Sequence, residues 1–257
     1  MYKLFQSLFI CAIVSATCSI PVKAKNNPIK ELTEICMLSE EIFQEYILLG
    51  LGIEPQQSAA QIKANITAVD SKLAGFQKIV EKNPQIVNKT QLIPHWKAIK
   101  LKASQPPQYS QANELKLLVN QFIEECLAID FQLINENDSR ASESYIKLSE
   151  LEILSRQMAS LYLLKAWGPK SHGSTKEFHD IAKKFSKELH ALLSMQEEIV
   201  PEEVKTILRQ VKSEFMVFKI FSNSNSGRYI PSLAKVKSDR IKSHLELALK
   251  REESELK

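Results

Sequence analysis

The chain has 257 residues and a formal net charge of +4, and 44% of its residues are hydrophobic. This length and apolar content allow one elongated domain or two small ones, each with a buried core. The small net charge, with lysines interspersed among glutamates, argues against nucleic acid as a partner. Only 6 glycines, beside abundant Leu, Ile, Lys, Glu and Ala, argue against a strand-rich fold, so we expect an all-α protein.

The first 24 residues have the pattern of a signal peptide. Lys3 supplies a basic start, the run from Leu4 to Ile20 is largely apolar, and Ala24 ends a stretch with small residues at the two positions that a signal peptidase reads. Cleavage after Ala24 would make the protein periplasmic or secreted. An N-terminal membrane anchor is the alternative, although a span needs about 20 apolar residues and polar residues interrupt this shorter run. Lipidation of Cys18 is disfavoured because Ser15 stands where a lipobox normally carries Leu.

Two cysteines, Cys36 and Cys126, remain after such a cleavage. Cys126 lies on an apolar stripe with spacings of three and four from Leu115 to Leu133, and Cys36 lies near the start of the first helix of the mature chain. If these two helices pack antiparallel, the two thiols lie at similar heights in a compartment that permits disulfides. A bridge and a pair of small buried apolar side chains are both open.

Eight helices are expected, because prolines and glycines divide the apolar periodicity into eight stretches. A first unit, residues 29–138, contains helices at 29–51, 57–82, 90–103 and 110–136. A second unit, residues 139–257, contains helices at 140–167, 174–196, 201–222 and 231–254. Gly52 and Gly168 suit the left-handed residue that ends a helix, and Pro201 and Pro231 suit a first helical turn. Residues 137–139 either interrupt the chain between the units or belong to a continuous helix, since no proline or glycine stands there. We expect the two units to form an elongated rod.

A shift of 116 residues aligns segment 32–52 with segment 148–168, and seven of the 21 aligned positions are identical. The identical positions include the pairs Ser39 and Ser155, Tyr46 and Tyr162, and Gly52 and Gly168. The apolar stripe of the next predicted helix keeps the same shift. Repetition at a fixed period is typical of a duplicated structural unit. The sequence therefore predicts two tandem copies of one four-helix bundle.

The repeated segment resembles the motif helix of the PilJ-type, or NarX-like, sensor domain. The likeness is carried by Met37-Leu-Ser39 in the first copy and by Ile153-Leu-Ser-Arg-Gln-Met-Ala159, followed by Tyr162-Leu-Leu164, in the second. That family forms the periplasmic sensing region of type IV pilus chemotaxis transducers and of nitrate/nitrite sensor kinases. The resemblance covers both halves after residue 28 and implies a helical bundle that binds a small ligand between facing helices.

The family's motif arginines help to bind a small anion, and this chain departs from the motif there. The matching positions carry Glu34 and Glu150, Cys36 and Glu152, and Glu41 and Gln157. A carboxylate reverses the charge and lacks the forked donors that suit a planar anion, so nitrate is not expected as the ligand. Arg156 restores a basic group one position early in the second copy. No output segment follows the helices, so we expect an accessory module that cannot signal by itself.

No catalytic or metal-binding signature is visible in the sequence. The five histidines lack the spacing of three or four that a helical metal site needs, and the mature chain has neither Glu-x-x-His nor Cys-x-x-Cys. There is no Gly-x-Ser-x-Gly elbow and no phosphate-binding glycine loop. We therefore expect no enzyme activity, metal or cofactor; an enzyme would need titratable side chains that converge in a cleft.

The expected function is an exported ligand-binding or sensory-accessory module that hands its signal to a membrane receptor or another protein partner. The candidate ligand-binding residues are Ser39, Tyr46, Ser155, Arg156, Gln157 and Tyr162. The alternative is a structural or protein-interaction bundle that has lost its ligand. In that case each serine hydroxyl bonds back to its own helix, and the tyrosines pack at helix ends.

Overall fold

The computed structural model describes residues 27–81, 91–137, 140–168, 172–222 and 229–253. Within these ranges it contains eight α-helices and no strand: α1 (Pro28–Gly50), α2 (Pro55–Val80), α4 (Leu92–Ala103), α5 (Tyr109–Asn137), α6 (Arg140–Trp167), α7 (His172–Ser194), α8 (Glu202–Ser222) and α9 (Pro231–Glu253). The prediction of an all-α bundle is confirmed, and each helix begins and ends within about two residues of its predicted bounds. The predicted signal peptide lies outside the described residues.

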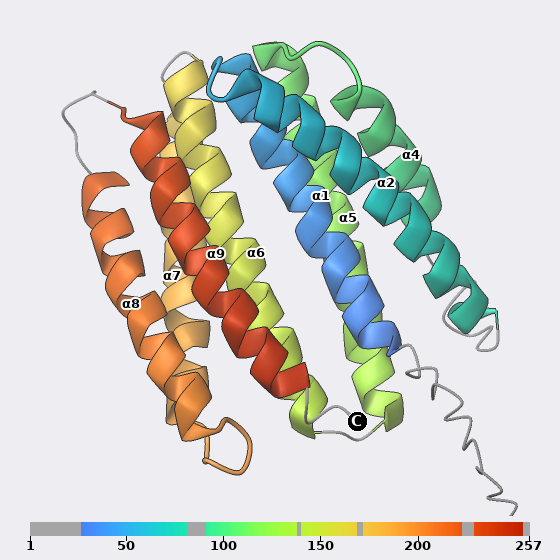
Figure 1. Cartoon of the computed structure of the whole chain (residues 1–257), viewed down its shortest axis with the longest axis vertical. Helices are drawn as coiled ribbons and strands as arrows, with labels where there is room; N and C mark the ends of the chain where they lie inside the picture. Colours follow the sequence, from blue (N-terminus) through green and yellow to red (C-terminus); the bar gives the residue numbers. More distant parts are fainter. Residues whose placement is uncertain (1–26, 82–90, 138–139, 169–171, 223–228, 254–257) are drawn as a thin grey trace, which may run out of the picture.

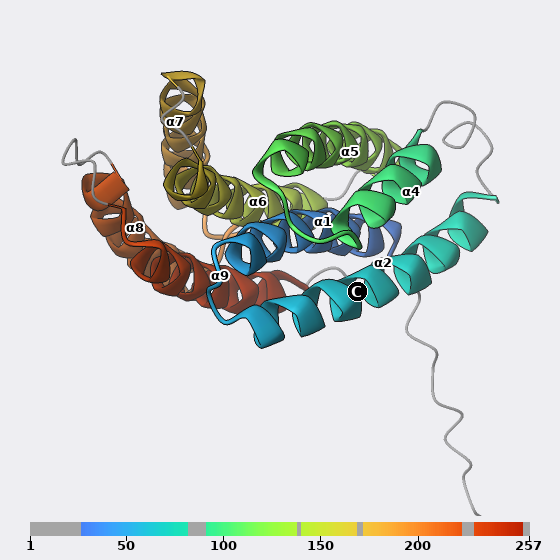
Figure 2. The ribbon, with the colours of Figure 1, turned by 90° about the horizontal axis from the view of Figure 1, so that it is seen from above.

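Helices α1 and α6 lie side by side at the centre and run in the same direction (Figures 1 and 2). Helix α1 packs against α2 and α5, and α6 packs against α7 and α9. The two outer helices, α4 and α8, pack against α5 and α9 respectively. Both halves therefore share one pattern, in which the first helix contacts the second and fourth and the third contacts the fourth. The duplication itself stays a prediction.

The prediction that the two units form an elongated rod is wrong, because the two halves lie side by side. Helix α5 ends at Asn137, α6 begins at Arg140, and the two run in opposite directions and contact each other (Figure 1). The chain thus turns back between the units, and α6 packs along α1. Neither proline nor glycine was needed for this reversal, which is why the sequence left both alternatives open.

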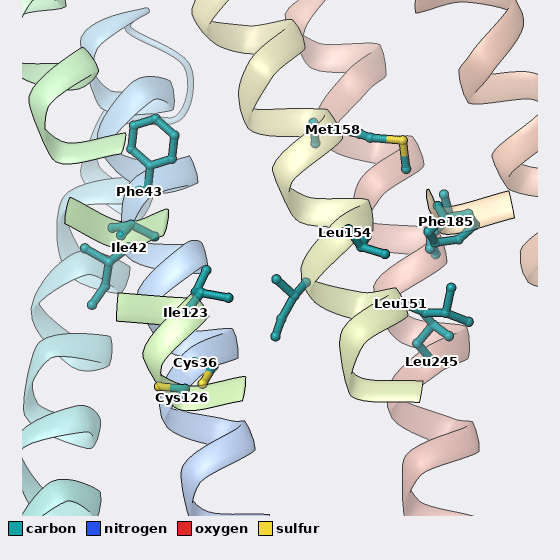
Figure 3. Close-up of a cluster of buried hydrophobic side chains, with 14 of the residues drawn as sticks. Cys36, Ile42, Phe43, Ile123, Cys126, Leu151, Leu154, Met158, Phe185 and Leu245 are labelled. Carbon is teal, nitrogen blue, oxygen red and sulfur yellow. The ribbon is translucent and has the colours of Figure 1, made fainter. Parts of the chain in front are cut away.

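Helix α1 is buried on most of its surface, because it contacts α2, α5 and α6 at once. Its apolar residues accordingly occur on more than one face, as expected for a helix inside a bundle. Figure 3 shows side chains of the core in both halves of the bundle. Phe43 and Ile123 lie between α1 and α5, and the second half contributes Leu154, Phe185 and Leu245 where α6 meets α7 and α9. Among the described helices, none combines the length and apolarity needed to cross a membrane.

The ends of α1 show why it starts and stops where it does. The Asn27 side chain accepts a hydrogen bond from the backbone N–H of Ile29 at 3.0 Å, and Pro28 occupies the first turn. After the helix, Gly52 adopts a φ of +70°, so its predicted left-handed conformation is confirmed. The same prediction for Gly168 is wrong, since its φ is not positive. Glycine is needed there because the Tyr109 ring lies where a Cβ would stand.

Cys36 of α1 and Cys126 of α5 face each other, and both are fully buried (Figure 3). The expectation that the two thiols lie at similar heights on antiparallel helices is therefore confirmed. The structure holds both as free thiols in contact.

Candidate functional site

A cluster of charged and polar side chains lies where α1 and α6 meet, within a mostly apolar core. We call it the polar layer; it consists of Glu40 and Glu41 of α1, Glu152, Arg156 and Ser160 of α6, and Lys242 of α9. Four of these six side chains belong to residues at most 4% exposed: Glu40, Glu152, Arg156 and Ser160. Burying charge in a core is costly unless each group is paired. The polar layer is therefore the feature of the core whose free-energy cost most requires a structural or functional explanation.

Arg156 is the centre of the polar layer. Its Nη2 donates to Glu152 Oε1 at 2.7 Å, and its Nε donates to the same oxygen at 3.2 Å. Residues four apart share a helix face, so this pair forms within α6. From the neighbouring helix, Glu41 Oε2 lies 3.4 Å from Arg156 Nη1. The guanidinium therefore ties α6 to α1 through two carboxylates.

Lys242 extends the polar layer to α9, because its Nζ donates to Glu41 Oε1 at 3.0 Å. Glu41 thus lies between two cations. Burial opposes its charge, but Arg156 and Lys242 outweigh that effect and hold the pKa of Glu41 below its usual value. Glu41 is therefore a carboxylate at neutral pH.

The pKa values of the other two carboxyl groups of the polar layer, those of Glu40 and Glu152, are raised and not lowered. Burial raises the pKa of Glu40 to about 8, although the hydrogen bond that Ser160 Oγ donates to Glu40 Oε1 at 2.8 Å and the charge of Arg156 both lower it. Burial also raises the pKa of Glu152 despite Arg156, and Glu152 Oε2 has no hydrogen-bond partner. Glu40 is therefore mostly protonated at pH 7, while Arg156 stays charged because Glu152 and Glu41 outweigh its burial and raise its pKa.

The two repeated serines bond back to their own helices. Ser39 Oγ donates to the carbonyl of Cys36 at 2.7 Å, and Ser155 Oγ donates to the carbonyl of Glu152 at 2.8 Å. Both residues are buried, and the two bonds span the same three positions. This geometry is the one expected for a structural bundle, in which each serine hydroxyl bonds to its own helix.

The two repeated tyrosines lie toward the C-terminal ends of α1 and α6, away from the polar layer. Tyr46 Oη accepts from the backbone N–H of Gln108 at 3.2 Å, just ahead of α5. Tyr162 Oη accepts from the backbone N–H of Ile230 at 2.9 Å, just ahead of α9. Each tyrosine therefore anchors the segment that leads into the fourth helix of its own half, a role that sequence reasoning did not find.

Gln157, the sixth predicted ligand-binding residue, donates from Nε2 to Asn120 Oδ1 of α5 at 3.4 Å. The structure therefore gives every predicted residue a partner within the chain and does not gather the six in one place. Ligand binding by these residues stays a prediction. What the sequence missed is the set of carboxylates around Arg156, although the spacing of four between Glu152 and Arg156 was visible.

No metal site is evident in the parts of the chain that the structure describes: no group of three or more His, Cys, Asp or Glu side chains is placed to hold an ion. The Nδ1 atom of His95 lies 3.0 Å from Glu125 Oε2, between α4 and α5. This pair joins α4 to α5 and does not form a metal site, so the polar layer remains the candidate site.

Comparisons with protein-family models, with curated proteins and with solved structures give no significant match. The resemblance to the PilJ-type domain therefore rests on the motif residues alone.

Proposed function

We propose that the chain is a non-catalytic sensory-accessory module of the PilJ type, and that the polar layer is its recognition element. The observation that supports the proposal is the buried Arg156, held between the two motif helices by carboxylates from both. Strongly perturbed ionisable groups gather at functional sites more than elsewhere in proteins. A layer of this kind also makes the contact between α1 and α6 sensitive to any added charge.

Recognition would work by replacement of a carboxylate of the protein at the Arg156 guanidinium by a ligand anion. Arg156 has five N–H donors in a planar fork, and Glu41 approaches it at 3.4 Å, longer than the 2.7 Å bond to Glu152. A small carboxylate or oxyanion could take the place of Glu41. Because Glu41 belongs to α1, its release from Arg156 would loosen α6 from α1 and leave Glu41 paired with Lys242 of α9 alone. A partner protein would read the resulting shift between helices.

A thermal-shift panel of small carboxylates and oxyanions tests this proposal. We expect at least one anion to raise the melting temperature of the unaltered protein, since a ligand at 100 times its Kd stabilises the folded state by about 2.7 kcal/mol. Arg156→Met should abolish the shift. Arg209→Met removes an arginine that is exposed on α8 and should leave the shift unchanged. The proposal fails if no anion shifts the unaltered protein, or if both variants respond as it does.

A second candidate, a protein-interaction bundle without a ligand, is favoured by a different observation. Helix α8 exposes Met216, Val217 and Ile220, which are 49%, 45% and 71% exposed and lie within about one turn. Grouped exposed apolar side chains are typical of interaction surfaces. In that case no anion of the panel shifts the melting temperature. Replacing these three residues with Gln should lower the recovery of a cross-linked partner protein and leave the melting temperature unchanged. Unchanged recovery would count against it.

A further inference from the structure

Helices α1 and α5 pack antiparallel in a fixed register around two cysteines. Thr33 Oγ1 donates to Asp130 Oδ2 at 3.3 Å, and one turn further along α1 the Cys36 thiol contacts the Cys126 thiol. The residue numbers rise along α1 while they fall along α5, as antiparallel packing requires. Figure 3 shows the two sulfur atoms side by side between the helices.

We infer that Cys36 and Cys126 form a disulfide that joins α1 to α5 when the chain folds in the presence of a disulfide oxidant. The inference does not depend on the proposed function. Both side chains are 0% exposed and lie against each other, so the bond needs only a small movement of two side chains. The bond would connect residues 90 positions apart and thereby close most of the first unit, residues 36–126, into one loop.

The reaction is a thiol–disulfide exchange with a small disulfide such as oxidised glutathione. The thiolate of one cysteine attacks a sulfur of the oxidant, forms a mixed disulfide and releases one glutathione thiolate. The thiolate of the second cysteine then attacks the protein sulfur of the mixed disulfide and releases the other glutathione. Two S–H bonds and the S–S bond of the oxidant are lost, one protein S–S bond forms, and the two electrons leave with two glutathione thiols.

Burial sets the time at which this reaction happens. It raises the pKa of both thiols, that of Cys36 well above its usual value, so the folded protein holds almost no thiolate there. An oxidant also cannot reach side chains that are 0% exposed. The bond therefore forms during folding, when α1 and α5 have come together but have not yet closed around the two thiols. Once they close, the disulfide is protected from reductants for the same reason and acts as a permanent cross-link.

Refolding followed by peptide mapping tests the inference directly. The full chain is denatured and reduced, refolded in oxidised and reduced glutathione, alkylated, and digested with trypsin without reduction. Cys36 falls on peptide 31–63, Cys126 on peptide 117–140, and Cys11 and Cys18 share peptide 4–23. We expect peptide 31–63 linked to peptide 117–140. Alkylated Cys36 and Cys126 in the refolded protein, or a link from either one to peptide 4–23, would overturn the inference.

A stability measurement gives an independent readout. Dithiothreitol added under denaturing conditions, before a second refolding, should lower the melting temperature of the unaltered protein. The same treatment should leave the double variant Cys36→Ala, Cys126→Ala unchanged. If the double variant does not fold, the single variant Cys126→Ala takes its place, and its melting temperature should not respond to reduction. An unaltered protein whose melting temperature ignores reduction would refute the cross-link.

Discussion

Replacing Glu40 with Gln should stabilise the protein at neutral pH and should lose this advantage in acid. Glu40 is 1% exposed, and burial raises the pKa of its carboxyl to about 8. The carbonyl oxygen of a glutamine can still accept the hydrogen bond from Ser160, and the amide cannot ionise. Glu40→Gln therefore keeps the shape and the hydrogen bond of the protonated side chain and removes its titration.

The direction in which the free energy of unfolding changes with pH follows from proton binding by Glu40 in the folded and unfolded states. The pKa of Glu40 is about 8 in the folded protein and near 4.5 in the unfolded chain, so between these pH values the folded state binds more protons. The free energy of unfolding of the unaltered protein therefore falls as pH rises from about 4.5 to about 8. At pH 7.5 about 3 pH units of this window have been crossed, and about 1.4 kcal/mol per unit gives an upper value of about 4 kcal/mol for the loss.

Urea unfolding followed by circular dichroism at pH 7.5 and pH 4.5 measures this difference. Glu40→Gln should exceed the unaltered protein by about 2–4 kcal/mol at pH 7.5 and agree with it within about 1 kcal/mol at pH 4.5. Glu203→Gln, which changes a side chain that is 75% exposed, is the control and should match the unaltered protein at both pH values. A Glu40→Gln variant that is less stable at pH 7.5 would show that Glu40 is ionised in the folded protein and would refute the argument.

Five further substitutions test how the motif helices and their neighbours pack. Arg156→Met should lower the free energy of unfolding by about 3–5 kcal/mol at pH 7.5, because it leaves buried carboxylates unpaired. The loss should be smaller at pH 4.5, where those carboxyl groups bind protons. An equal loss at both pH values in urea unfolding would contradict this explanation. Tyr46→Phe and Tyr162→Phe each remove the acceptor of a backbone N–H and should each cost about 1 kcal/mol in chemical unfolding; a cost in one half alone would argue against equivalent roles. Gly50→Ala places a methyl group where an indole ring of α6 lies, so calorimetry should show a free energy of unfolding lower by about 1–3 kcal/mol. Gly75 of α2 has open space around it, so Gly75→Ala should raise the free energy of unfolding by about 0.5–1 kcal/mol.

Local chemistry made the helices predictable. Prolines and glycines mark most of their ends, and the chain chemistry at such residues acts over one or two positions. Gly52 shows the rule working, with its φ of +70° directly after α1. Gly168 shows its limit, since glycine stands there to let the Tyr109 ring approach and not to reverse the backbone. A sequence pattern does not distinguish these two reasons for a glycine.

The candidate site was less predictable because its partners come from different helices. The pair Glu152 and Arg156 could be recognised from its spacing, but Glu41 approaches Arg156 only because α1 and α6 pack in parallel. Which faces of two helices meet depends on the whole bundle, and no local pattern encodes it. The repeat correctly singled out α1 and α6 as a pair of interest. It could not show that their polar residues would already satisfy one another.

The ion pair between Lys242 and Glu41 also has a consequence for the order in which the protein is made. Lys242 follows the end of α6 at Trp167 by 75 residues. At a translation rate of about 5–20 residues per second, Glu41 and Arg156 would wait roughly 4–15 s for this second cation after α6 has been synthesised. The contact between the two central helices therefore reaches its final charge balance only after the ribosome has synthesised about half of α9, up to Lys242.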